Sequence, residues 1–435
     1  MTEYSLNELE EWNQRIEVLA KEAGLDCYEQ IFETCSYEDM LCYEAYVGMP
    51  SHYPHWSFGK AYERQKTFYQ YNLTGLPYEL VINSNPCLAY LMRDNTLLLQ
   101  ILTMAHVYGH NDFFKSNRLF REGTRAELTV ETFKAHADRV RSYIQDPSLG
   151  AAKVERILDA AHALRYQVRR QGEGKLPDRT QREKEDKETV PVRLKDDLLG
   201  FLAKRSRLED WEKDLVGMVR EESFYFLPQI ETKIMNEGWA SYWHYRLLNK
   251  LELPQSLHLE FLQRHNLVVR PHEGRLNPYF VGFKMFEYLA KQGGDAKIME
   301  IRANDRDNSF IRRYLNRELC EELHLFAYRV RGVDLVVSET ADEEGWKPIR
   351  DQLANAVGLG SVPVISVIGV DNSVLVLEHD YDGRELEMGY AKETIKYVAV
   401  LWGNRVELKT KLNNRNKIIR CDTEGNVSVM DDAPA

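Results

Sequence analysis

Two histidines four residues apart are the feature of the sequence with the clearest chemical potential. His106 and His110 lie in the apolar stretch 93–121, which predicts a helix, and their spacing puts both imidazoles on one helix face. Zinc-binding HExxH helices use this spacing to hold one ion between two rings. Here the residue after the first histidine is Val107, where those helices carry the glutamate that takes a proton from metal-bound water. The pair therefore predicts a metal site that lacks the usual hydrolytic base.

A third ligand is suggested by the segment 235–244. Glu237 and His244 are seven residues apart, and at about 100° per residue they fall within about 20° of the same helix face. We interpret Asn236 as the cap of this helix. The hypothesis is one divalent ion, zinc, iron or manganese, held by the histidine pair and Glu237. His244 is then a fourth ligand or a proton-transfer group behind the ligands.

Another carboxylate would have to replace the missing base. Asp112, Glu221, Glu222 and Glu287 are the candidates, and the sequence does not choose among them. We take Asp112, close to the histidine pair, and His244 as the candidate catalytic groups. Two further interpretations remain open: the metal is structural, or the histidines are hydrogen-bonded core residues without a metal.

The aromatic segment 42–86 holds candidate substrate contacts. Aromatic and basic groups that suit sugars or anions come together at His55, Trp56 and Lys60, although packing of an ordered loop is the simpler explanation. Asn83 and Asn85 follow a predicted short strand at 78–82, and they either face a pocket or cap the next helix.

Composition excludes several classes of protein. The chain has 435 residues, of which 43% are hydrophobic and 29% charged, as in ordinary globular proteins. The net charge of −11 provides no overall positive field for nucleic acid or anionic membranes. The acidic start is unlike a signal peptide, which favours the cytosol. The longest uncharged run, 352–370, contains Pro363 and three glycines, so no transmembrane segment is expected.

The six cysteines form no C-x-x-C pair. Reduced, mostly buried thiols are the simplest interpretation of so sparse a set. Cys27, Cys35 and Cys42 are the alternative, as a metal or redox group.

Helical periodicity dominates the first three quarters of the chain. It predicts a mainly α body over residues 1–330, interrupted at about 171–200 by a charged stretch that we interpret as a mobile excursion or linker. Short β-branched runs then predict a smaller β-rich or α+β domain over 335–430. Asp382-Gly383 is the predicted hairpin turn. The expected fold class is mainly α, and α+β overall.

Five ordered motifs resemble the SpoVR family, stage V sporulation protein R. They are GMPSHYPHWSFGK (48–60), YELVINSNP (78–86), HVYGHNDFF (106–114), NEGWASYWH (236–244) and NPYFVGFKMFEYL (277–289). The resemblance implies a cytoplasmic bacterial protein associated in spore formers with the peptidoglycan cortex, and in other bacteria with stress responses. It also implies a link to a PrkA-like serine kinase pathway. NEGWASY is more loosely similar to the third-ligand helix of gluzincin-like peptidases, which implies a zincin-like helical body.

Three functions follow as hypotheses. The first is a metal-dependent, hydrolase-like enzyme that acts on amide or peptide bonds of cell-wall precursors. The second is a zincin-like scaffold that keeps a metal and works by binding a partner, which Val107 favours because the base is missing. The third is a metal-free regulatory or stress-response protein that acts through partners.

Overall fold

The computed structural model describes residues 4–70, 79–170, 197–272, 276–331 and 334–432. Contacts divide the chain into two compact units, each made of two separate parts of the sequence. Unit 1 comprises residues 1–135 and 228–361, and unit 2 comprises 136–227 and 362–435. This division differs from the expected 1–330 and 335–430, because the helices of 136–227 group with the C-terminal sheet.

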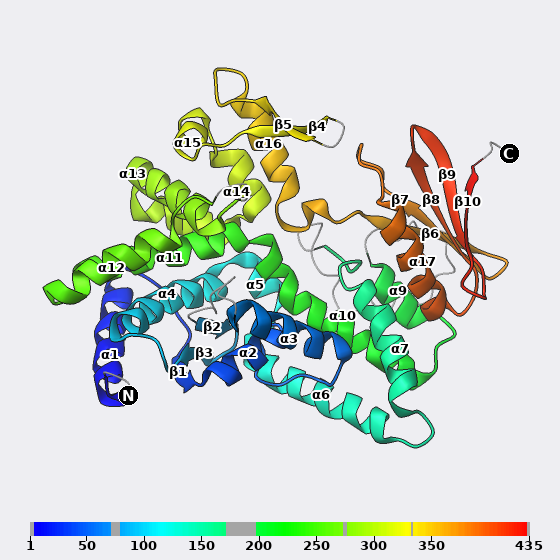
Figure 1. Cartoon of the computed structure of the whole chain (residues 1–435), viewed down its shortest axis with the longest axis horizontal. Coiled ribbons are helices and arrows are strands. Elements are labelled where there is room, and N and C mark those ends of the chain that lie inside the picture. Colours follow the sequence, from blue (N-terminus) through cyan, green and yellow to red (C-terminus); the bar gives the residue numbers. More distant parts are fainter. Residues whose placement is uncertain (1–3, 71–78, 171–196, 273–275, 332–333, 433–435) are drawn as a thin grey trace. The chain divides into compact units, whose positions relative to one another are not determined.

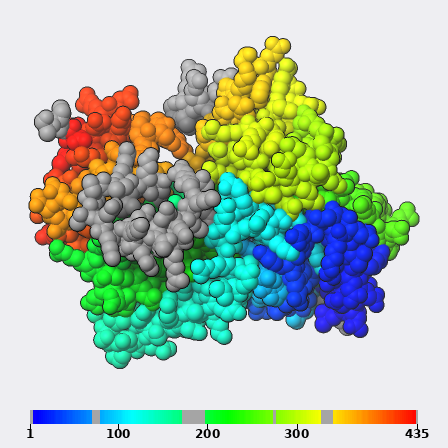
Figure 2. All heavy atoms as spheres, turned by 180° about the vertical axis from the view of Figure 1, so that it is seen from behind, coloured from blue at the N-terminus to red at the C-terminus, as the bar shows by residue number. Residues whose placement is uncertain are grey.

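Unit 1 is mainly helical. Its helices are α1 (Leu6–Glu22), α2 (Tyr37–Ala45), α3 (Trp56–Gln70), α4 (Leu97–Ser116), α5 (Arg118–Gly123), α11 (Lys233–Lys250), α12 (Gln255–Val268), α13 (Pro278–Asn304), α14 (Asp307–Tyr314), α15 (Arg317–Glu322) and α16 (Trp346–Ala356), with the 3₁₀ turns Ala126–Leu128 and Gly358–Ser361. Figure 1 shows α4 and α11 running side by side. Blue N-terminal residues adjoin green residues from the middle of the chain in Figure 2. Arg15 of α1 donates a hydrogen bond to the carbonyl of Leu251, directly after α11.

Helix α11 is packed very closely between α4 and α13. A Cβ atom on Gly109 of α4 would lie 2.6 Å from the Cα of Ala240, and one on Gly238 would lie 2.3 Å from the backbone of Gly282 in α13. Such distances mean that only glycine fits at these two crossings. Gly109 therefore allows α4 to approach α11 closely, and Gly238 and Gly282 allow α11 to approach α13.

A small sheet completes unit 1 next to α4. It consists of β1 (Gln30–Cys35), β2 (Glu79–Ile82) and β3 (Cys87–Met92), in the order β1-β3-β2, with β1 parallel and β2 antiparallel to β3. β2 confirms the strand predicted at 78–82. A separate pair, β4 (Ala327–Arg331) and β5 (Asp334–Glu339), is antiparallel.

Unit 2 combines helices with a five-stranded sheet. The helices are α7 (Gly150–Ala163), α9 (Leu198–Arg205) and α17 (Met388–Trp402), together with most of α6 (Thr129–Gln145) and α10 (Asp210–Glu231), which cross the unit boundary. The strands are β6 (Ile365–Asp371), β7 (Val374–His379), β8 (Val406–Leu412), β9 (Arg415–Cys421) and β10 (Val427–Asp431), in the order β10-β9-β8-β7-β6. The parallel pair β7 and β8 is joined through α17, as parallel pairs require.

The hairpin prediction at Asp382-Gly383 is wrong, because these residues lie between β7 and α17. The hairpins β6-β7 and β8-β9 instead turn at Asn372-Ser373 and Asn413-Asn414, and all four turn residues have positive φ. Asparagine tolerates this conformation because its short polar side chain bonds locally.

The fold class predicted from the sequence, mainly α and α+β overall, is confirmed by these elements. The predicted charged excursion at 171–200 lies almost wholly outside the described residues, although its last residues begin α9. All six cysteines are free thiols.

Candidate metal centre

His106 and His110 point their Nε2 atoms at one carboxylate of the neighbouring helix. Both histidines lie on one face of α4 and are buried, with 3% and 6% of their surface exposed. The Oε2 atom of Glu237, on α11, lies 3.8 Å from Nε2 of His106 and 3.5 Å from Nε2 of His110. The structure thus brings together the three residues that the helical spacing selected as ligands.

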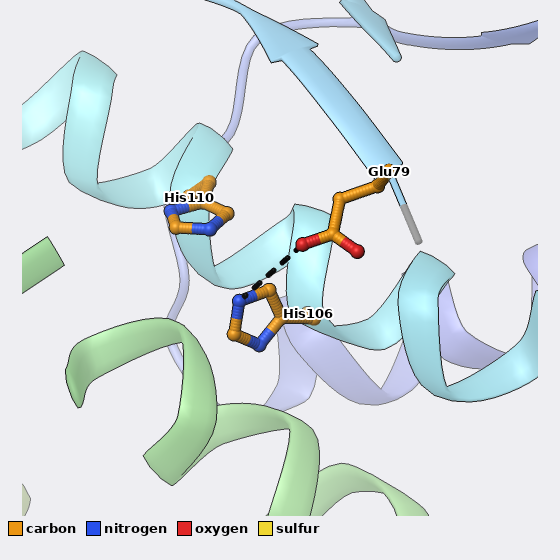
Figure 3. Close-up of side chains that lie close together, drawn as sticks. All are labelled: Glu79, His106 and His110. Carbon is orange, nitrogen blue, oxygen red and sulfur yellow. Dashed lines mark ion pairs between the residues drawn. The ribbon is translucent and has the colours of Figure 1, made fainter. Parts of the chain in front are cut away.

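Glu79 joins them from the small sheet. It is the first residue of β2, and its Oε1 atom lies 3.8 Å from Nε2 of His106. Ligand atoms of Glu79, His106 and His110 all lie within 4.8 Å of one another (Figure 3). Sequence reasoning missed Glu79, although a lone acidic residue opening the apolar strand ELVI was an available signal.

The convergence of these atoms fits a divalent cation. Nε2 of His106 and Oε2 of Glu237 are buried and have no hydrogen-bond partner among the described residues. Two ligand atoms of a tetrahedral zinc site, each about 2.1 Å from the metal, lie about 3.4 Å apart, close to the 3.5 and 3.8 Å separations found here. Imidazole with carboxylate suits zinc, iron or manganese.

The protonation states of these residues also suit a cation. Burial, reinforced by the charge of His106, lowers the pKa of His110 to about 4, so its ring is neutral at pH 7. Burial raises the pKa of Glu237, but its interactions with His106 and His110, together with the charge of Lys233, outweigh burial and lower it overall. A neutral imidazole beside an ionised carboxylate is the state in which both groups bind a metal.

Asn236 orients His110. Its Oδ1 atom lies 2.8 Å from Nδ1 of His110, so the ring donates there and its Nε2 lone pair faces Glu237. The interpretation of Asn236 as a helix cap is wrong, because α11 already begins at Lys233. The buried carboxylate of Asp307 instead accepts hydrogen bonds from the amides of Ile234 and Met235 in the first turn.

His244 lies behind His106. Its Nδ1 atom is 2.9 Å from Nδ1 of His106, and its Nε2 atom is 2.8 Å from Nδ1 of His265. Both nitrogens of His244 are therefore engaged, which leaves neither available as a fourth ligand. His265, on α12, was not selected from the sequence.

The ring of Tyr279 stacks on that of His106, with ring centroids 6.1 Å apart. The charge of Glu237, followed by burial and the charge of Glu79, raises the pKa of Tyr279 well above its usual value. Its hydroxyl is therefore protonated, and it interacts electrostatically with the carboxylates of both Glu237 and Glu79.

Asp112 belongs to a different network. Its carboxylate accepts hydrogen bonds from Arg302 at 2.7 Å, from the indole of Trp239 at 2.7 Å and from the amide of Asp26 at 2.8 Å. Burial raises its pKa to about 6, against the opposing charge of Arg302. This carboxylate ties α4 to α11 and α13, and the structure does not bring it to the centre.

The other proposed carboxylates are also engaged elsewhere. Glu222 is buried and lies 2.9 Å from Nδ1 of His136 in unit 2, so it is not on a solvated helix face, and Glu221 lies 3.4 Å from Nε2 of the same ring. Glu287 pairs with Lys284 at 3.2 Å. Glu79 is the carboxylate that the structure adds to the centre.

The predicted substrate residues form two groups. At the start of α3, the rings of His55 and Trp56 have centroids 5.6 Å apart, and the ammonium of Lys60 lies 5.8 Å from the Trp56 ring, which is 53% exposed. Asn83 donates to the hydroxyl of Thr124 at 2.9 Å. The backbone amide of Asn85 donates to the carbonyl of Ala126, so both asparagines anchor the β2-β3 turn.

Within the part of the chain that the structure describes, every helix is too short or too polar to cross a lipid bilayer.

Comparison with known proteins agrees with the motifs. A family model described as "SpoVR like protein" matches residues 3–188 and 173–362, and one described as "SpoVR-like C-terminal domain" matches 363–413. The chain is 33% identical over 476 residues to the uncharacterized protein YcgB of Escherichia coli strain K12, covering 94% of this chain and 92% of that relative. No solved structure matches the chain. The chain belongs to the SpoVR family.

Proposed function

We propose that the protein is a metal-dependent, hydrolase-like enzyme whose centre is formed by His106, His110 and Glu237. The observation that carries the proposal is the pair of buried atoms, Nε2 of His106 and Oε2 of Glu237, that face each other at 3.8 Å and find no hydrogen-bond partner in the described parts of the chain. Buried polar atoms are normally satisfied, and a cation between them satisfies both at once. A divalent ion bound at this place would act as a Lewis acid and would lower the pKa of a water molecule bound to it.

Glu79 replaces the base that Val107 cannot provide. Oε2 of Glu237 lies within 3.8 Å of Nε2 of both histidines, whereas Glu79, on the sheet, comes that close to His106 and lies within 4.8 Å of His110. We assign Glu237 as the third ligand and Glu79 as the general base that accepts a proton from water. The protonated hydroxyl of Tyr279 is the donor that stabilises negative charge developing on a carbonyl oxygen.

The proposed substrates are amide bonds of cell-wall precursors. This part rests on membership of the SpoVR family and its association with the peptidoglycan cortex of spores, not on the centre itself. The same membership supports action in the cytoplasm, a connection to a PrkA-like serine kinase pathway and a stress-response role in other bacteria. The exposed Trp56 with Lys60 suits the sugar and carboxylate groups of such precursors.

A zincin-like scaffold that acts through a partner is the second candidate. Val107, fully buried, favours it, because the position of the usual base is used for packing. A scaffold of this kind would bind a metal at the same residues but would cleave no substrate.

Hydrolysis of a synthetic muramyl pentapeptide by the metal-loaded protein distinguishes the two candidates. We expect cleavage by the native sequence, and a loss of about 10²-fold or more in Glu79→Gln with its metal content unchanged. Glu237→Gln is expected to lose both metal and activity. Metal uptake with no cleavage would favour the scaffold, and full activity in Glu79→Gln would overturn the assignment of the base.

A further inference from the structure

Three buried imidazoles form a continuous hydrogen-bonded chain that leads away from the centre. Nδ1 of His106 meets Nδ1 of His244 at 2.9 Å, and Nε2 of His244 meets Nδ1 of His265 at 2.8 Å. The three rings come from α4, α11 and α12. They are 3%, 0% and 4% exposed, so the chain is enclosed by protein.

The hydrogen bonds that link the three imidazoles can run in only two directions. A neutral imidazole carries one N–H donor and one acceptor nitrogen, so the ring of His244 must donate on one side and accept on the other. The side chains of His244 and His265 are 0% and 4% exposed, and burial disfavours the charged form of an imidazole, so both rings are neutral. Every donor in the chain then points either toward His265 or toward His106.

The direction decides whether His106 can bind a metal. When His106 donates from Nδ1, its Nε2 carries a lone pair directed at the carboxylates of Glu79 and Glu237. When the chain runs the other way, Nε2 of His106 carries the hydrogen and interacts with those carboxylates as a donor. Only the first arrangement provides a metal ligand, and it requires Nδ1 of His265 to accept.

We propose that His265 is a positioning residue of the metal centre, which holds the metal-binding tautomer of His106 through His244 by accepting a hydrogen bond at Nδ1. The inference rests on the proposed metal centre. Metal ligands commonly bond through their second nitrogen to a carboxylate or carbonyl, which are acceptors only. A chain of imidazoles performs the same task without adding negative charge, and its direction is set by the metal.

The packing of His265 supports this role. Its ring lies against Tyr245, Phe283 and Phe261, with centroids 4.6, 5.0 and 6.1 Å away. Aromatic rings on several sides hold the imidazole in one orientation, as the hydrogen bond to His244 requires.

Zinc affinity, measured by competition with a chelating dye, tests the role of His265. We expect His265→Ala to bind Zn²⁺ about 10-fold more weakly than the native sequence. We expect His265→Asn to restore most of the affinity, since its Oδ1 atom can accept from His244 where Nδ1 did. His258→Ala is the matched control, a half-buried histidine on the same helix that packs on Phe261, and it should bind zinc normally.

Nitrogen-15 NMR of histidine-labelled native protein provides a second test, which does not depend on whether a variant folds. In the zinc-loaded protein, His244 and His265 should both carry hydrogen on Nε2 and none on Nδ1. Hydrogen on Nδ1 of His265 in that state, or unchanged zinc affinity in His265→Ala, would overturn this inference but leave the centre standing. A native protein that binds no zinc, iron or manganese would overturn the proposed function as well.

Discussion

Asn236 accepts a hydrogen bond from His110 across the interface of α4 and α11, with Oδ1 and Nδ1 2.8 Å apart. Because Asn236 precedes Glu237 on the same helix, one turn supplies both a ligand and the group that orients another ligand. Removing the acceptor in Asn236→Ala is expected to weaken metal binding by about 10-fold or more. Asn236→Asp keeps an acceptor at this place and should retain binding, so equal zinc affinities in both variants would contradict this role.

The close crossing of α11 and α13 at Gly238 predicts a large effect of one methyl group. A Cβ atom there would lie 2.3 Å from the backbone of Gly282, so Gly238→Ala must push the helices apart. We expect a loss of about 3 kcal/mol in the free energy of unfolding, the upper part of the range for overpacking, together with weaker zinc binding, because Glu237 moves with the helix.

Gly59→Ala is the control for this crossing. Gly59 lies within α3, and a Cβ atom at this position would have nothing within 4 Å, so alanine should be neutral or stabilise by up to about 1 kcal/mol. Urea unfolding checks both variants. A Gly238→Ala protein as stable as the native sequence would contradict the packing described for α11.

His136 predicts a pH dependence that is independent of the metal centre. Burial lowers the pKa of His136. The hydrogen bonds that it forms with Glu221 and Glu222, together with the negative charges of these two residues, outweigh burial and raise the pKa to about 9. The unfolded pKa is about 6.5, so the folded state binds the proton more tightly. The resulting stabilisation is complete below pH 6.5 and is lost as pH rises from there through about 9.

Urea unfolding of the native sequence and of His136→Gln at pH 6, 8 and 10 measures this contribution. The stability difference between the two proteins should be largest at pH 6 and smallest at pH 10. A difference that stays constant over this range would show that folding does not raise the pKa of His136.

Local patterns in the sequence were sufficient to predict the ligands on helices. Helical spacing pairs His106 with His110 and Glu237 with His244, because periodicity fixes which residues share a face, and the likeness of NEGWASY to gluzincin-like peptidases supports Glu237 as the third candidate ligand. Glu79 does not, since only the pairing of β2 with β3 and the packing of the sheet on α4 bring a strand residue to the histidines.

Long-range contacts also explain the wrong interpretation of Asn236. The first turn of α11 is stabilised by Asp307, a residue more than seventy positions away, so the helix begins before the residue that looks like a cap. The buried ion pair of Glu222 with His136 likewise joins two helices that are distant in sequence. Neither relationship leaves a local signal.

Metal content of tag-free protein, determined by mass spectrometry, tests the central claim most directly. The account predicts about one equivalent of zinc, iron or manganese in the native protein and in His258→Ala, and a loss of that metal in His106→Ala, His110→Ala and Glu237→Ala, all folded by circular dichroism. A folded native protein that contains none of these metals and binds none when they are added would contradict it.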